Sequence, residues 1–151
     1  MKNEMTLTFN AISVNEAFAR NAVAAFCVDL DPTIDQINDI KTAVSEAVTN
    51  CIVHAYPNGA ADDLVTIKTT LENDTVHIVI SDTGVGIENI DNALQPFYTS
   101  KPEQERSGMG FTVMESFMDT LRVEHNEPRG TVVLMTKTIR GGDWNKKKHC
   151  D

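Results

Sequence analysis

Three polar residues, Glu46, Asn50 and His54, follow one another at intervals of four in a stretch with helical periodicity. Residues four apart lie on one face of a helix, so the three side chains form a single track beside an apolar stripe. A carboxylate and an amide at the edge of a core helix need partners, because burying them unpaired is unfavourable. They either bond to a neighbouring strand or to water, or they face a bound ligand.

A second polar group, Asp82-Thr83-Gly84-Val85-Gly86, comes directly after an expected strand. Glycine permits a positive φ and lets a ligand approach the backbone closely. An aspartate at the end of a strand can accept a hydrogen bond from the amino group of a purine. The alternative is a plain turn that the aspartate caps.

A third group, Ser107-Gly108-Met109-Gly110-Phe111, opens an expected helix. The free N–H groups and the dipole at the start of a helix attract phosphate. A glycine-rich helix start without a ligand is the alternative.

The order of the three groups is more specific than any one of them. A helical E-x-x-x-N, a D-x-G-x-G after a hairpin, a polar loop and a G-x-G before a helix together resemble the GHKL nucleotide site. That site is shared by DNA gyrase, Hsp90, histidine kinases and MutL, and the resemblance covers about residues 34–136. It implies ATP or ADP as the ligand, with Mg²⁺. The chain has no G-x-x-x-x-G-K-[ST], so a P-loop is not expected.

The resemblance also implies roles for individual residues. Asn50 would coordinate Mg²⁺, and Asp82 would bind the adenine amino group. Gly84 and Gly86 would let the backbone approach the base, and Thr131 would support adenine recognition. The other residues expected at the nucleotide are His54, Thr99, Lys101, Arg106, Ser107, Gly108, Met109 and Gly110.

Residues 97–101 resemble the start of the lid that covers ATP in this group. Lys101 and Arg106 are therefore candidate cations for the β- and γ-phosphates, although either could be a solvated loop charge. Catalysis of phosphoryl transfer is mainly positioning and charge neutralisation. Glu46 lies one helical turn before Asn50, and we hypothesise that it is the general base for a substrate serine.

Residues 45–50, 99–103 and 105–111 carry a narrower resemblance, to the serine kinases that are also anti-sigma factors in spore-forming bacteria. This implies a homodimer that binds and inhibits sporulation sigma factor F. It also implies a kinase that phosphorylates a serine of a small anti-anti-sigma factor with Mg-ATP. Two alternatives stay open: a related switch kinase of another stress pathway, and a non-catalytic ATP-gated binding module.

The expected elements follow the order β-α-α-β-β-loop-α-β-β. Periodicity predicts strands at 5–9, 64–71, 75–81, 121–125 and 131–138, and helices at 14–29, 33–55 and 108–118. Residues 88–94 are a candidate short helix before the loop. Paired strands predict an α+β fold, a two-layer α/β sandwich of the Bergerat type with helices on a mixed, mainly antiparallel sheet. We expect one domain over residues 1–139, followed by a basic tail at 140–151 that is frayed or contacts a partner.

Two capping boxes mark the first two helices, Ser13 with Glu16 and Thr33 with Gln36. The apolar residues expected to face the core from the first helix are Val14, Phe18, Ala22, Val23, Phe26 and Cys27. Cys27 and Cys51 both fall on apolar stripes, so they are expected to be small core residues rather than zinc ligands.

The formal charge of −9, from 13 basic and 22 acidic residues, argues against a general nucleic-acid binder. No apolar run approaches the roughly 20 residues that span a bilayer. The first residues contain no apolar secretory segment. We therefore expect a cytoplasmic protein without membrane contact.

Overall fold

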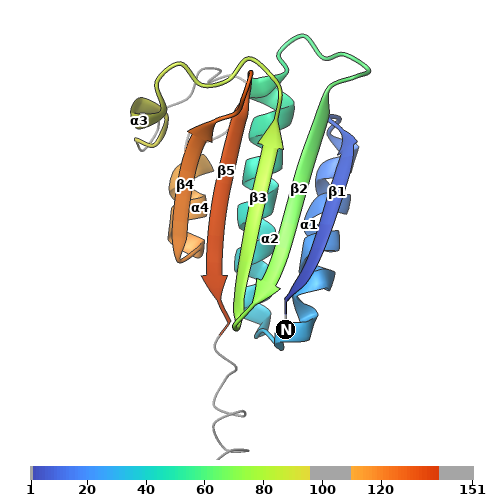
Figure 1. Ribbon diagram of the computed structural model, residues 1–151, viewed down its shortest axis with the longest axis vertical. Coiled ribbons are helices and arrows are strands. Elements are labelled where there is room, and N and C mark those ends of the chain that lie inside the picture. The colour runs from blue at the N-terminus through green and yellow to red at the C-terminus, as the bar shows by residue number, and fades with distance from the viewer. Residues whose placement is uncertain (1, 96–109, 140–151) are drawn as a thin grey trace, which may run out of the picture.

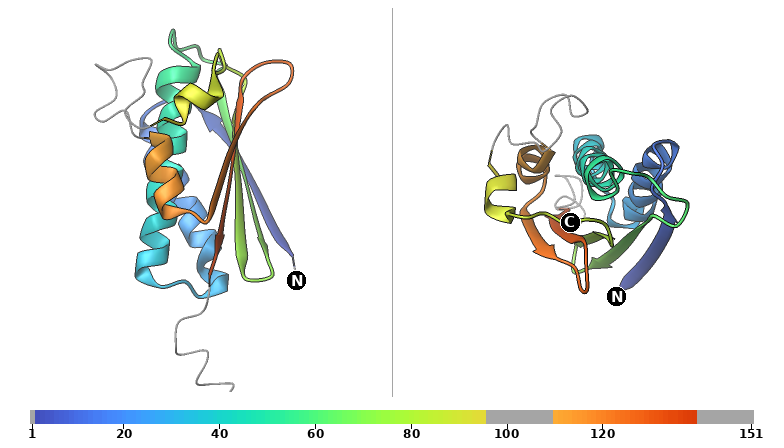
Figure 2. Two further views of the ribbon diagram at one scale, coloured as in Figure 1. Left: turned by 90° about the vertical axis from the view of Figure 1, so that its left-hand side faces the viewer. Right: turned by 90° about the horizontal axis from the view of Figure 1, so that it is seen from above.

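A five-stranded sheet forms one layer of the molecule, and helices cover one of its faces (Figure 1, Figure 2). The computed structural model describes residues 2–95 and 110–139. The strands are β1 (Asn3–Asn10), β2 (Leu64–Glu72), β3 (Thr75–Asp82), β4 (Thr120–His125) and β5 (Thr131–Thr138). They lie in the order β1-β2-β3-β5-β4, and all four neighbouring pairs are antiparallel. The α+β class is confirmed, with a fully antiparallel sheet where a mixed, mainly antiparallel one was expected.

The helical layer contains α1 (Val14–Phe26), α2 (Ile34–Asn50) and α4 (Gly110–Phe117), with α2 packed between the other two. A 3₁₀ turn, η1 (Cys27–Leu30), follows α1, and a π-helical turn, η2 (Cys51–Ala55), extends α2. The short α3 (Ile90–Ala93) lies beyond β3. None of the helices within the described ranges has the length and apolar character needed to cross a bilayer.

Strand alternation determines what the sheet presents to the helices. In β3, the side chains of Val76, Ile78 and Ile80 are buried at every second position. Asp82 is the next residue in that series and is 5% exposed. Since alternate residues share a face, Asp82 points into the helical layer like the apolar residues before it. The strand thus places a carboxylate at the end of the core.

The expected capping box of α2 is confirmed. The Thr33 hydroxyl accepts the Gln36 N–H at 3.1 Å, and the Gln36 side chain accepts the Thr33 N–H at 2.8 Å. The capping box expected at Ser13 is wrong, because Ser13 already has helical dihedral angles and its side chain caps nothing. Its expected partner, Glu16, instead accepts two hydrogen bonds from Arg20, at 2.7 and 2.6 Å.

The inward face of α1 also differs from expectation. Val14 and Phe18 are 71% and 56% exposed, whereas Ala19, Val23 and Cys27 are buried against the core. Ala19, Val23 and Cys27 pack α1 against the layer beneath it, and Val14 and Phe18 lie off that contact face. The beginning of α1 therefore presents apolar side chains to solvent.

Candidate functional site

The Asp82 carboxylate lies at the centre of a set of hydrogen bonds from three segments. Its Oδ1 accepts the Gly84 N–H at 3.0 Å and the Thr131 N–H at 3.2 Å. Its Oδ2 accepts the Cys51 thiol at 3.5 Å. The carboxylate is therefore fixed by the turn after β3, by the start of β5 and by the end of the long helix, by which we mean α2 with its π-helical extension η2.

Burial dominates the electrostatics of this group. It raises the pKa of Asp82 above the ordinary carboxyl value, although the bonds from Gly84, Cys51 and Thr131 each act to lower it. Burial and, secondarily, the nearby Asp82 raise the pKa of the Cys51 thiol well above its usual range. The thiol therefore stays protonated and can donate to the carboxylate.

The turn after β3 packs directly on the end of the long helix. The Val85 N–H donates to the Ala55 carbonyl at 2.8 Å. A Cβ on Gly84 would lie 2.1 Å from the same oxygen, so only glycine fits there. This glycine lets the turn approach the helix. Packing therefore explains a glycine that the sequence analysis had attributed to the approach of a ligand.

The β4–β5 connection supports the turn from its other side. The Asn126 side chain donates to the Asp82 carbonyl at 2.8 Å, and Arg129 Nε donates to the Gly84 carbonyl at 2.7 Å. Gly130 has φ +111°, and a Cβ there would lie 2.1 Å from the Asp82 carbonyl oxygen. Gly86, with φ +78°, faces the Gly130 backbone. The two glycine-containing turns thus lie against each other.

Tyr56 links three segments through its hydroxyl group. Its hydroxyl donates to the Leu64 carbonyl at 2.7 Å and accepts the Thr83 N–H at 2.8 Å. The residue is buried, and it follows the π-helical turn directly. It connects the end of the helix, the start of β2 and the turn after β3.

Glu46, Asn50 and His54 are half-buried on the long helix, but they do not form one regular track. Glu46 and Asn50 belong to α2, whereas His54 belongs to the π-helical turn η2. A π turn bonds i to i+5, so it displaces His54 from the position that α-helical spacing predicts. Wide turns of this kind are frequent at functional sites.

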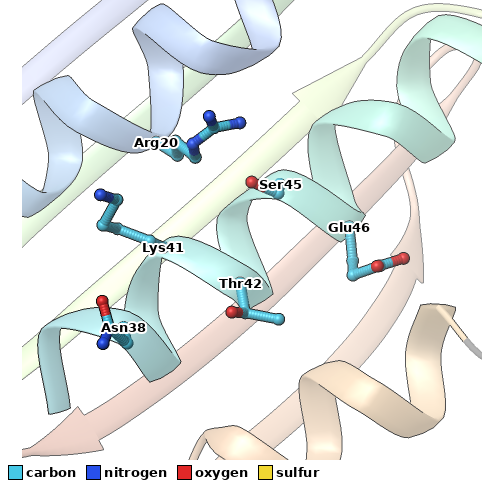
Figure 3. A pocket seen from close by; sticks show the side chains of 6 residues that line it. All are labelled: Arg20, Asn38, Lys41, Thr42, Ser45 and Glu46. Atoms are coloured by element: carbon cyan, nitrogen blue, oxygen red, sulfur yellow. The ribbon is translucent and has the colours of Figure 1, made fainter. Parts of the chain in front are cut away.

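A pocket of about 290 Å³ opens on the helical layer beside Glu46. Its other lining residues are Arg20 from α1 and Asn38, Lys41, Thr42 and Ser45 from α2. In Figure 3 the Glu46 side chain points away from Arg20, to the side of α2 on which α4 lies. Glu46 therefore lines the pocket, and its carboxylate is directed to the α2–α4 side.

Gly110 is buried at the first position of α4, which begins on the side of the molecule where the long helix ends (Figure 1, Figure 2). Six further predicted contacts lie outside the described residues. These are Thr99, Lys101, Arg106, Ser107, Gly108 and Met109. The structure thus brings together Asp82, Gly84, Gly86 and Thr131, with the Asn50 end of the long helix beside them.

The donor chemistry fits a magnesium nucleotide. Within residues 2–95 and 110–139, no group of three or more His, Cys, Asp or Glu side chains is arranged to hold a metal. Mg²⁺ does not need such a cage, since it commonly takes one or two protein oxygens together with phosphates and water. The Asn50 side-chain oxygen can supply one such ligand. The Asp82 carboxylate can accept a hydrogen bond from an exocyclic amino group.

Sequence reasoning missed the supporting residues Cys51, Tyr56, Asn126 and Arg129. All four act on the Asp82 turn from segments remote from it in the chain. No spacing pattern in the sequence predicts contacts between such distant segments. The one available signal was the position of Cys51, immediately after the predicted metal ligand.

The family described as histidine kinase-like ATPase domain matches residues 10–137. An anti-sigma F factor of Clostridium beijerinckii is 58% identical over 135 residues, which are 89% of this chain and 94% of the relative. One from Geobacillus thermodenitrificans is 55% identical over 139 residues, 92% of this chain and 94% of the relative. One from Priestia megaterium is 51% identical over the full length of both chains.

Two solved structures share the fold. The RsbU and RsbW domains of Rv1364c from Mycobacterium tuberculosis align with a TM-score of 0.65 and 16% identity, covering 91% of this chain and 32% of that one. The catalytic domain of the histidine kinase ThkA aligns with a TM-score of 0.57 and 15% identity, covering 89% and 96%. At these identities the likeness concerns the architecture alone.

Proposed function

Since the chain belongs to the histidine kinase-like ATPase family and, within it, to the anti-sigma F factors, we propose that it is an ATP-dependent anti-sigma factor and protein serine kinase. In this proposal it binds and inhibits sporulation sigma factor F. It also transfers phosphate from Mg-ATP to a serine of a small anti-anti-sigma factor.

The observation that carries the nucleotide part is the buried, fixed Asp82 carboxylate. Two N–H groups and a thiol hold it at the end of the core, beside two glycine-containing turns. A carboxylate in this setting can accept the amino group of adenine, and Thr131 lies next to it to support the base. Gly86 keeps the neighbouring backbone free of a side chain.

Asn50 and Glu46 supply the catalytic part of the proposal. Asn50 would hold Mg²⁺, whose charge offsets that of the phosphates. Glu46 lies one turn earlier on α2 and lines a pocket of about 290 Å³, where a partner segment can enter. Its carboxylate would accept the proton of the attacking serine hydroxyl. His54 and Gly110 would complete the described part of the nucleotide site.

The partner part rests on the identity with anti-sigma F factors over most of the chain. The names of these relatives state a sigma factor as their target, and we extend that target to this chain. The exposed apolar residues at the start of α1 are the surface on which we place the homodimer contact.

The experiment is a phosphoryl-transfer assay with Mg²⁺, γ-labelled ATP and a purified anti-anti-sigma protein. The wild-type protein is expected to label a serine of the partner. Asn50→Ala is expected to abolish the label, and Glu46→Gln to reduce it about 100-fold or more while ATP still binds. Binding to purified sigma factor F, with and without nucleotide, is measured in parallel.

ATP binding without any labelling would reject the kinase and leave a nucleotide-gated binding module. Labelling without sigma factor F binding would indicate a switch kinase of another pathway. A Glu46→Gln variant with the wild-type rate would show that Glu46 is not the base.

A further inference from the structure

Cys51 is the first residue of the π-helical turn and is 3% exposed. Its backbone N–H bonds to the carbonyls of Ala47 and Val48, so the turn fixes the position of its side chain. The thiol lies 3.5 Å from Asp82 Oδ2. Cys51 is thus the residue through which the long helix touches the buried carboxylate.

The hydrogen bonds at Asp82 are unevenly divided between its two oxygens. A carboxylate offers about four acceptor positions, two on each oxygen. Oδ1 accepts two N–H groups, from Gly84 and Thr131, whereas Oδ2 accepts only the Cys51 thiol within the described part of the chain. The position left for a ligand is therefore on Oδ2, the oxygen that the thiol orients.

We propose that Cys51 is a positioning residue for adenine, whose thiol holds Asp82 Oδ2 in the orientation that accepts the exocyclic amino group. The inference rests on the proposed nucleotide function and assigns a selectivity role to a residue outside the expected contacts. Without the thiol, the two bonds at Oδ1 are the hydrogen bonds to the carboxylate that remain within residues 2–95 and 110–139 to oppose its rotation. The amino group then meets an acceptor that is less well oriented.

The competing explanation is that Cys51 merely fills the core. Cys27 does so, since it is fully buried and donates no hydrogen bond to Asp82. A core-filling residue affects every nucleotide alike, because it acts through the stability of the fold. A positioning residue affects only ligands that carry the amino group.

The test compares ATP with purine riboside 5′-triphosphate, which lacks that amino group. The Kd of both ligands is measured by calorimetry for the wild type, Cys51→Ala, Cys51→Val and the control Cys27→Ala. Loss of one hydrogen bond predicts a Kd for ATP about 2- to 10-fold weaker in both Cys51 variants, with the purine riboside Kd unchanged. Valine fills the space of the thiol without donating, so an effect shared by both variants belongs to the donor.

An equal loss for both nucleotides, or no loss for ATP, would overturn the role of Cys51. Cys27→Ala is expected to keep the wild-type ratio of the two Kd values. If the wild type binds neither nucleotide, the proposed function itself fails. If it binds both equally, Asp82 does not read the amino group, and the inference falls while nucleotide binding stands.

Discussion

The carbonyl oxygen of Ala55 occupies the space in which a side chain of Gly84 would lie. A Cβ at position 84 would be 2.1 Å from that oxygen, and the neighbouring Val85 N–H bonds to it at 2.8 Å. The turn after β3 and the end of the long helix are therefore built as one unit. A displacement of either one moves the Asp82 carboxylate.

Gly84→Ala is expected to weaken both the fold and nucleotide binding. The clash involves backbone rather than a flexible side chain, so we expect the free energy of unfolding to fall by roughly 1–3 kcal/mol. Urea denaturation and ATP titration measure the two effects. Gly59→Ala is the control, because no atom lies within 4 Å of the Gly59 Cβ position, and its φ of +55° accounts for any loss of stability there. That variant should lose some stability and keep its ATP affinity.

ATP affinity is expected to fall as the pH is lowered. Burial raises the pKa of Asp82 above 3.8, and only the ionised carboxylate has its full set of acceptors for the amino group. Protonation therefore opposes binding, and because the pKa of Asp82 is raised, the loss sets in at a higher pH than it would for an ordinary carboxyl group. The Kd for ATP and for purine riboside 5′-triphosphate is measured from neutral pH downward on folded protein. A Kd for ATP that stays constant across the range would contradict the assigned role of Asp82.

Thr69→Val is expected to stabilise the protein. Thr69 is fully buried in β2, and its hydroxyl is the one buried side-chain polar atom without a hydrogen-bond partner in residues 2–95 and 110–139. Replacing an unsatisfied hydroxyl by a methyl group of similar shape removes a desolvation penalty of about 1–3 kcal/mol. Chemical denaturation measures the gain. Thr70→Val, on the opposite face of the strand, should change stability by less than about 0.5 kcal/mol.

Lys137→Met is expected to destabilise the contact between α2, α4 and the sheet. Lys137 Nζ donates to the Phe117 carbonyl at 2.6 Å and pairs with Asp39 at 3.4 Å. Methionine keeps the apolar stem but loses the charged donor, for a loss of about 1–3 kcal/mol in the free energy of unfolding. Lys68→Met is the matched control, since the Lys68–Glu4 pair is exposed and contributes little. Equal effects of the two substitutions would count against a structural role for Lys137.

Phe18→Glu is expected to convert the proposed homodimer into a monomer without unfolding it. Phe18 and Val14 are four residues apart on α1, so they share one face, and both are exposed. A charge there disfavours burial against a second copy but disturbs no core contact. Sedimentation equilibrium gives the mass, and circular dichroism confirms the fold. A dimer of unchanged affinity would place the contact elsewhere.

Sequence patterns predicted the fold where the responsible signal was local. The Thr33–Gln36 capping box and the β2–β3 hairpin depend on residues adjacent in the chain, and both are confirmed. The turn of that hairpin contains two residues with positive φ, Asn73 at 52° and Asp74 at 60°, which suits their residue types. Local chemistry was sufficient for these elements.

Prediction failed where two local solutions competed. Glu16 could cap α1 or pair with Arg20, and it pairs with Arg20. Periodicity grouped Val14 with Val23, but it does not tell which apolar positions a helix packs and which it exposes. The bond from Cys51 to Asp82 depends on the packing of distant segments, so no local pattern contains it.

The strand order has a consequence for the speed at which the chain folds. Helices α1 and α2 lie in the chain between β1 and its partner β2, and α4 and β4 lie between β3 and its partner β5. Closing such long segments slows folding, because chain entropy is lost before the distant pairing compensates for it. The β2–β3 hairpin needs no such closure and is the natural nucleus. We therefore expect substitutions in it to change the folding rate, and those in β1 to change mainly the unfolding rate.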